Sequence, residues 1–120
     1  MRRYVVQIGM GVDLHGQNAT VAAQRAIRDA IGTNSLPGLR ELGGIKSLDQ
    51  MIVEVIIACP YPAEHIDSQK VLEVLPFGQK TLRVVPGGML APSGSVIKDL
   101  GDTSDDIVVC NACVIVGVPD

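Results

Sequence analysis

An aspartate and a histidine stand close together near the start of the chain, within the glycine-rich segment Gly9-Met10-Gly11-Val12-Asp13-Leu14-His15-Gly16. Asp13 and His15 are two residues apart, so in an extended chain both side chains project from one face and can meet the same ligand. A carboxylate beside an imidazole can fix the tautomer of the ring and prepare it to act as a general acid or base. The pattern therefore predicts acid–base chemistry at these two residues.

The residues that follow this pair predict a site for an anion. Gly16 and Gln17 come at the start of an expected helix, whose N-cap is Asn18. Free N–H groups and the positive end of the helix dipole favour a small carboxylate or phosphate at that position. Arg83 could pair with an anionic ligand, although a surface salt bridge is an alternative use for it. The predicted ligand-binding residues are Gly9, Gly11, Gly16, Gln17, Asn18 and Arg83.

Two other interpretations of the motif remain open beside the catalytic one. In a purely structural interpretation, the glycines make a tight turn while Asp13 and His15 bond to loop backbone. In a metal-site interpretation, folding gathers ligand-type side chains that match no recognised spacing in the sequence. Those side chains are Asp13, His15, Cys59, Glu64 and His65. We expect neither a metal nor a cofactor, and a dinucleotide is excluded because Leu14 takes the third glycine position of G-x-G-x-x-G.

The elements that must position these residues follow from the hydrophobic pattern. The predicted strands cover residues 4–8, 51–58, 80–85 and 107–118, with the first ending near Gly9, where the backbone can turn sharply. The predicted helices cover about 19–31, with an alanine-rich apolar stripe, and 67–75; a short helical turn is expected after residues 35–37. Residues 93–106 are expected to form an exposed loop with a possible short strand at Val96 and Ile97. The order β-α-β-α-β-β predicts an α/β (α+β) fold with a single mixed sheet and two main helices.

Length and composition restrict the class of protein. A chain of 120 residues with 47% hydrophobic residues can bury one core, so we expect a single domain over residues 1–120. The net charge is −3, and no basic cluster beyond Arg2-Arg3 is present, which argues against nucleic acid as a partner. The longest apolar run, residues 51–59, is far shorter than the ~20 residues that cross a bilayer. Without a membrane span or a signal-peptide pattern, we expect a cytoplasmic protein.

Two features of the apolar runs bear on the assembly and on the redox state. The runs predict strands that two helices cannot cover alone, so neighbouring subunits are expected to cover the rest. Within one run, Glu54 faces either a cleft or subunit seam or the wetter side of the sheet. The three cysteines are odd in number and lie in or beside apolar runs, which suits reduced core thiols. Cys110 and Cys113 form a C-x-x-C pattern, but on a strand their side chains point to opposite faces.

The spacing G-x-G-x-D-x-H-G resembles the signature of the Lin0512 family of uncharacterised proteins, and the resemblance extends along the entire chain. It supports Asp13, His15 and their glycines as a site and implies nothing about the substrate. The element order is also similar, at the level of fold, to the monofunctional chorismate mutases and the RidA-type deaminases. Those proteins are trimers with ligand clefts between subunits, so the similarity implies a trimer, or a multiple of it, and no function.

Together these observations favour an oligomeric enzyme that acts on a small anionic metabolite. Asp13 and His15 would transfer protons, and the amides of Gly16 and Gln17 would hold the anion. The alternative is an oligomer without catalytic activity that binds a small ligand or serves as a scaffold.

Overall fold

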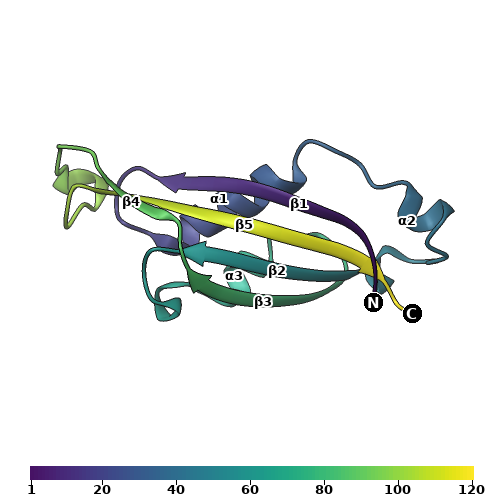
Figure 1. Ribbon diagram of the computed structural model, residues 1–120. Helices are drawn as coiled ribbons and strands as arrows, with labels where there is room; N and C mark the ends of the chain where they lie inside the picture. Colours follow the sequence, from purple (N-terminus) through teal and green to yellow (C-terminus); the bar gives the residue numbers. More distant parts are fainter.

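Five strands form one mixed sheet in the computed structural model, which describes residues 1–120. The strands are β1 (Arg2–Asp13), β2 (Ile52–Cys59), β3 (Gln79–Pro86), β4 (Met89–Pro92) and β5 (Asp106–Val118). Their order is β1-β5-β2-β3, and β4 pairs with the first residues of β5 (Figure 1). Only β2 and β3 are parallel. The predicted α+β class with a mixed sheet is confirmed, with one strand more than expected.

Three helices connect the strands, and only the first is long. They are α1 (Ala19–Ile31), α2 (Gly38–Glu41) and α3 (Ser68–Leu72). The loops also contain the 3₁₀ turns η1 (Leu48–Gln50), η2 (Ala63–His65) and η3 (Lys98–Leu100). α1 has the predicted bounds, and the Asn18 side chain caps it by accepting the N–H of Val21. α3 is shorter than predicted because the chain tightens into i→i+3 bonds at Val74 and Leu75. None of these helices has the length and apolar character needed to span a bilayer.

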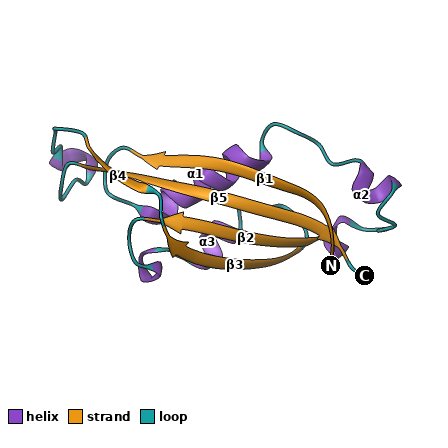
Figure 2. Cartoon of the chain, in the orientation of Figure 1, coloured by secondary structure: helices purple, strands orange, loops and turns teal.

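The core lies between the sheet and the helices α1 and α3, which cover the same face, while α2 lies beyond the end of the sheet (Figure 2). Along β2, Val53, Val55 and Ile57 are buried under the helices, and the residues between them are half-buried on the opposite face. In the single chain the helices therefore cover only one face of β2. Glu54 lies on the uncovered face, a position that fits both of its interpretations, a cleft or subunit seam and the wetter side of the sheet.

Gly9 and Gly11 lie inside β1 rather than at its end, so the predicted turn there is wrong. A Cβ at Gly9 would come 2.3 Å from the Ala30 nitrogen, and one at Gly11 would come 2.1 Å from the Ala22 carbonyl oxygen. The two glycines therefore let the backbone of α1 lie directly on β1, opposite the alanine stripe of the helix. This contact fixes the start of α1 beside the end of β1, where Asp13 and His15 follow.

The uncovered face of the sheet is largely apolar. On β1, Val6, Ile8 and Met10 are 52%, 67% and 54% exposed. Their neighbours across the sheet include Ile115 and Cys113 of β5. The two cysteines of the C-x-x-C pattern lie on opposite faces, because Cys110 is buried under the helices while Cys113 is half-buried on this open side. All three cysteines are unpaired, as expected.

The loop between β4 and β5, residues 93–105, folds back toward the start of α1. Val96 and Ile97 form no strand in it, and the strand of this region is β4, which precedes the loop. Gly101, with φ at 85°, ends η3 in the left-handed region and lies against Gly16. The loop thereby meets the turn that joins β1 to α1.

Candidate functional site

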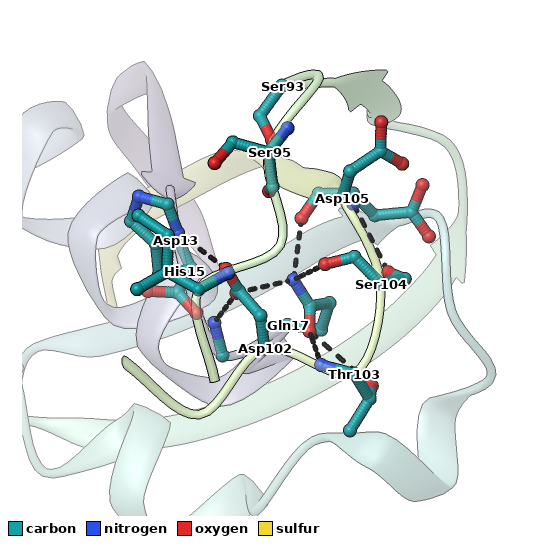
Figure 3. Close-up of polar contacts among 12 residues, drawn as sticks. Asp13, His15, Gln17, Ser93, Ser95, Asp102, Thr103, Ser104 and Asp105 are labelled. Carbon is teal, nitrogen blue, oxygen red and sulfur yellow. Dashed lines mark hydrogen bonds and ion pairs between the residues drawn. The ribbon is translucent and has the colours of Figure 1, made fainter. Parts of the chain in front are cut away.

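Asp102, in the loop between β4 and β5, is the acidic partner of His15. The His15 Nδ1 atom lies 2.7 Å from Asp102 Oδ2 (Figure 3). The Asp102 side chain is only 1% exposed, whereas that of His15 is 29% exposed. The two residues are 87 positions apart in the sequence, so the fold alone brings them together.

Asp102 has enough donors around it to remain a carboxylate. Its Oδ2 accepts the N–H of Ile97 at 2.9 Å, and its Oδ1 accepts the N–H of Gly16 at 2.7 Å and the Gln17 side-chain amide at 3.0 Å. The hydrogen bond from Ile97, followed by those from Gly16 and His15, holds the pKa of Asp102 well below its usual 3.8. Asp102 is therefore ionised at neutral pH and can only accept hydrogen bonds.

An ionised Asp102 determines which nitrogen of His15 carries the proton. Since the carboxylate only accepts, the 2.7 Å contact requires His15 Nδ1 to donate. In the neutral ring the other nitrogen, Nε2, then keeps its lone pair and makes no hydrogen bond within the protein. His15 thus combines a fixed tautomer with a partly exposed basic nitrogen, which is the arrangement of a general base held by a carboxylate.

Asp13 stabilises the turn between β1 and α1 and does not bond to the imidazole of His15. No hydrogen bond joins it to His15; its Oδ2 accepts the N–H of Asn18 at 2.8 Å, and its Oδ1 lies 3.5 Å from Arg25 Nη1. The Asp13 side chain is 10% exposed and that of Arg25 is 52% exposed. Arg25 Nη1 also donates to the carbonyl of Val12, so this pair ties the end of β1 to α1.

Gln17 fastens the loop to the turn. Its backbone takes a φ of 51°, and its side-chain amide donates to Asp102 and to the carbonyls of Ser104 and Asp106. Its Oε1 accepts the N–H of Thr103 at 3.0 Å (Figure 3). The Gly16 amide, predicted with that of Gln17 to hold an anionic ligand, is bonded to Asp102, and the Asn18 amide is bonded to Asp13. The anions at the start of α1 are thus the chain's own carboxylates.

The remaining sequence candidates lie elsewhere in the molecule. Gly9 and Gly11 are covered by α1, as described above. Arg83 lies on β3, at the sheet edge opposite β1, beside a shallow hollow of about 240 Å³ that Glu54 also lines. His65 stacks on Tyr61, with 5.2 Å between ring centroids. No three side chains of the metal-ligating types lie close enough together to hold an ion.

The surface around His15 is open rather than hollowed. None of the cavities of the single chain is lined by Asp13 or His15. His15 could be predicted from the sequence but Asp102 could not, because Asp102 lies in a Ser-, Gly- and Asp-rich loop whose pattern indicates only solvent exposure. The one local signal is the preceding Gly101, whose positive φ turns the chain toward Gly16.

Comparisons with known proteins agree with this architecture. The family model described as a conserved hypothetical protein (Lin0512 family) matches residues 3–116. The chain is also similar to a crystal structure from Nostoc punctiforme, described as an FtsZ-like protein of unknown function. The two share 43% sequence identity over 98% of this chain and 97% of that one, with a TM-score of 0.87. A comparison with curated proteins finds no match.

Proposed function

We propose that this chain, which belongs to the Lin0512 family, is an oligomeric enzyme that acts on a small anionic metabolite by acid–base chemistry at His15. The observation that carries the proposal is the 2.7 Å contact between His15 Nδ1 and the buried carboxylate of Asp102. Asp102 keeps the proton on Nδ1 and stabilises the imidazolium that forms when Nε2 takes a proton. His15 is the catalytic residue of the proposal, and Asp102 is its positioning residue.

Asp13 has a supporting part in this scheme. It fixes the turn through Asn18 and holds Arg25 near the end of β1. Only Nη1 of Arg25 is bonded in the protein, so the other N–H groups of a half-exposed guanidinium can meet a carboxylate or phosphate. We assign the anionic group of the substrate to Arg25, while the amides of Gly16 and Asn18 hold Asp102 and Asp13 in place.

The oligomer in this proposal covers the apolar face of the sheet. Val6, Ile8 and Met10 are each more than half exposed on a face that no helix covers (Figure 2). We propose that other copies of the chain pack against this face and bury it, and that the assembly is a trimer or a multiple of it. The three unpaired cysteines fit a reducing compartment, so we place the protein in the cytoplasm.

Proton abstraction can be tested before the complete reaction is known. Candidate small carboxylates and phosphomonoesters would be incubated with the protein in D₂O, and the loss of their C–H signals would be followed by ¹H NMR. We expect one compound to exchange, and His15→Ala to abolish that exchange. His65→Ala is the matched control, because His65 is the only other histidine and its ring forms no hydrogen bond with His15 or Asp102. Exchange that survives His15→Ala would contradict the proposed role.

The assembly has its own test. Light scattering at micromolar concentration should give a multiple of the 12.7 kDa chain mass. Ile8→Glu would place a charge on the exposed apolar face and should shift the population toward single chains. A wild-type protein that is already monomeric would contradict the oligomer.

A second candidate function is a non-catalytic ligand-binding or scaffold oligomer. It is favoured by the absence of a cavity at His15 and by the bonds through which Gln17 and Asp102 fasten the loop. In that case His15→Ala and Asp102→Asn would lower thermal stability, and no tested compound would show exchange that depends on His15.

A further inference from the structure

We propose that a cavity at the opposite end of the molecule from His15 binds a small amphipathic molecule with a hydrocarbon body and one anionic head group. The cavity lies near α2, and the loop that carries Asp102 lies at the other end of the sheet (Figure 1). No residue that lines it belongs to the His15 site, so this proposal is independent of the function proposed above.

The walls of the cavity are mostly apolar. Its floor is the covered face of the sheet, with Val53 of β2 and with Val114 and Val116 of β5. Leu36 and Phe77, from the segments beside α2 and after α3, form part of the walls. The volume is about 420 Å³, within the range of roughly 300–1,000 Å³ that is usual for small-molecule sites.

The cavity is partly open to solvent, so a small molecule can reach it from the surface. An apolar cavity of roughly 150 Å³ accommodates benzene, so about 420 Å³ admits a hydrocarbon body on the order of ten carbons. The apolar walls supply no partner for a charge along that body.

The charge of the ligand follows from the adjoining hollow. Arg40, Leu48 and Phe77 line both the large cavity and a second one of about 290 Å³, which Lys46 and Asp49 also line. Arg40 and Lys46 are exposed and form no ion pair in the protein. With two cations against one carboxylate, the second hollow has a net positive charge and favours an anionic head.

A polar pair inside the cavity gives a reporter for binding. Gln7, only 6% exposed, points from β1 to the covered side and donates through its side-chain amide to the Asn34 side chain. Both residues line the cavity, so an occupant must lie against this pair. Their side-chain NH₂ signals are separate from the backbone signals in an ¹H–¹⁵N spectrum and can be followed directly.

The test is a titration of the whole protein with sodium decanoate, below its micelle concentration, followed by ¹H–¹⁵N NMR. We expect saturable shifts at Gln7, Asn34 and Val114, and weaker binding of decanol, which lacks the charge. The double variant Arg40→Gln/Lys46→Gln should weaken decanoate binding by about 5- to 20-fold and leave decanol binding unchanged. The double variant Arg28→Gln/Lys70→Gln removes the same charge at positions that line no cavity, and should bind like the wild type.

Leu48→Trp places a larger side chain where the two hollows meet, and should reduce the binding of both decanoate and decanol. The absence of saturable shifts with decanoate would overturn the proposal. Equal affinity of the wild type and of Arg40→Gln/Lys46→Gln would overturn the anionic head. If decanoate fails to bind and Leu48→Trp changes the oligomeric state, the cavity is a contact between copies of the chain, and the proposal is again overturned.

Discussion

Replacing Gly11 with alanine tests whether Gly9 and Gly11 are needed for the close packing of α1 on β1. A Cβ at this position would lie 2.1 Å from the Ala22 carbonyl oxygen and 2.2 Å from the Ala26 nitrogen. Ordinary contact begins at 3.4 Å, so α1 would have to retreat by about 1.3 Å. Both atoms belong to the backbone of the helix, so no side-chain rotation can relieve the clash.

The expected cost lies at the upper end of the range for overpacked cores, about 3 kcal/mol. In a chain of 120 residues, that corresponds to a melting temperature lower by about 10 °C. The free energy of unfolding would be measured by urea denaturation, followed by far-ultraviolet circular dichroism, with a thermal melt as a second readout.

Gly94→Ala is the control for this substitution. Gly94 also has a special backbone conformation, with φ at 78°, but a Cβ there would meet nothing within 4 Å. Its replacement should cost only about 1 kcal/mol, from backbone strain alone. A Gly11→Ala protein as stable as the wild type, or no less stable than Gly94→Ala, would refute the close approach of α1 to β1.

Two further predictions concern the titratable groups. Burial, with a contribution from Cys59, raises the pKa of the Cys110 thiol to about 12. This thiol should therefore resist N-ethylmaleimide at mildly alkaline pH until the protein is unfolded. Rapid labelling of Cys110 in the native protein, detected by mass spectrometry, would contradict its burial. Because the pKa of Asp102 is lower in the folded protein than its usual 3.8, its contribution to stability is complete above that value and is lost as the pH falls through the folded pKa. The free energy of unfolding, measured with urea between about pH 7 and about pH 2, should therefore fall less steeply with decreasing pH in Asp102→Asn than in the wild type. The same pH dependence in both proteins would argue against the hydrogen bonds to Asp102.

The sequence was sufficient where the determining interactions are local. The cap at Asn18 and the alanine stripe predict the bounds of α1. The long apolar runs predict β2 and β5, and the alternating pattern predicts β3, each to within a residue or two. The same local reasoning misplaced the end of β1. Gly9 and Gly11 are typical of a turn, but glycine is required at these positions because the backbone of α1 packs directly against them. Only the folded chain shows that contact.

The site was predictable only in part for the same reason. His15 could be found from its neighbours, because a histidine and an aspartate two residues apart are visible in the sequence. Its hydrogen-bond partner could not be found in this way, because Asp102 lies in a distant loop that hydrogen bonds from Gln17 and Gly16 hold against the turn before α1. Asp13, the partner that proximity indicated, is instead held by Asn18 and Arg25.

The tautomer of His15 shows whether Asp102 holds the proton on Nδ1 and leaves Nε2 free. A long-range ¹H–¹⁵N correlation of the imidazole rings reports which nitrogen is protonated in the neutral form, and His65 supplies an internal reference. We expect a proton on Nδ1 of His15 in the wild type and a mixture of the two tautomers in Asp102→Asn. A proton on Nε2 of His15, or a mixture of tautomers in the wild type, would contradict the role of Asp102.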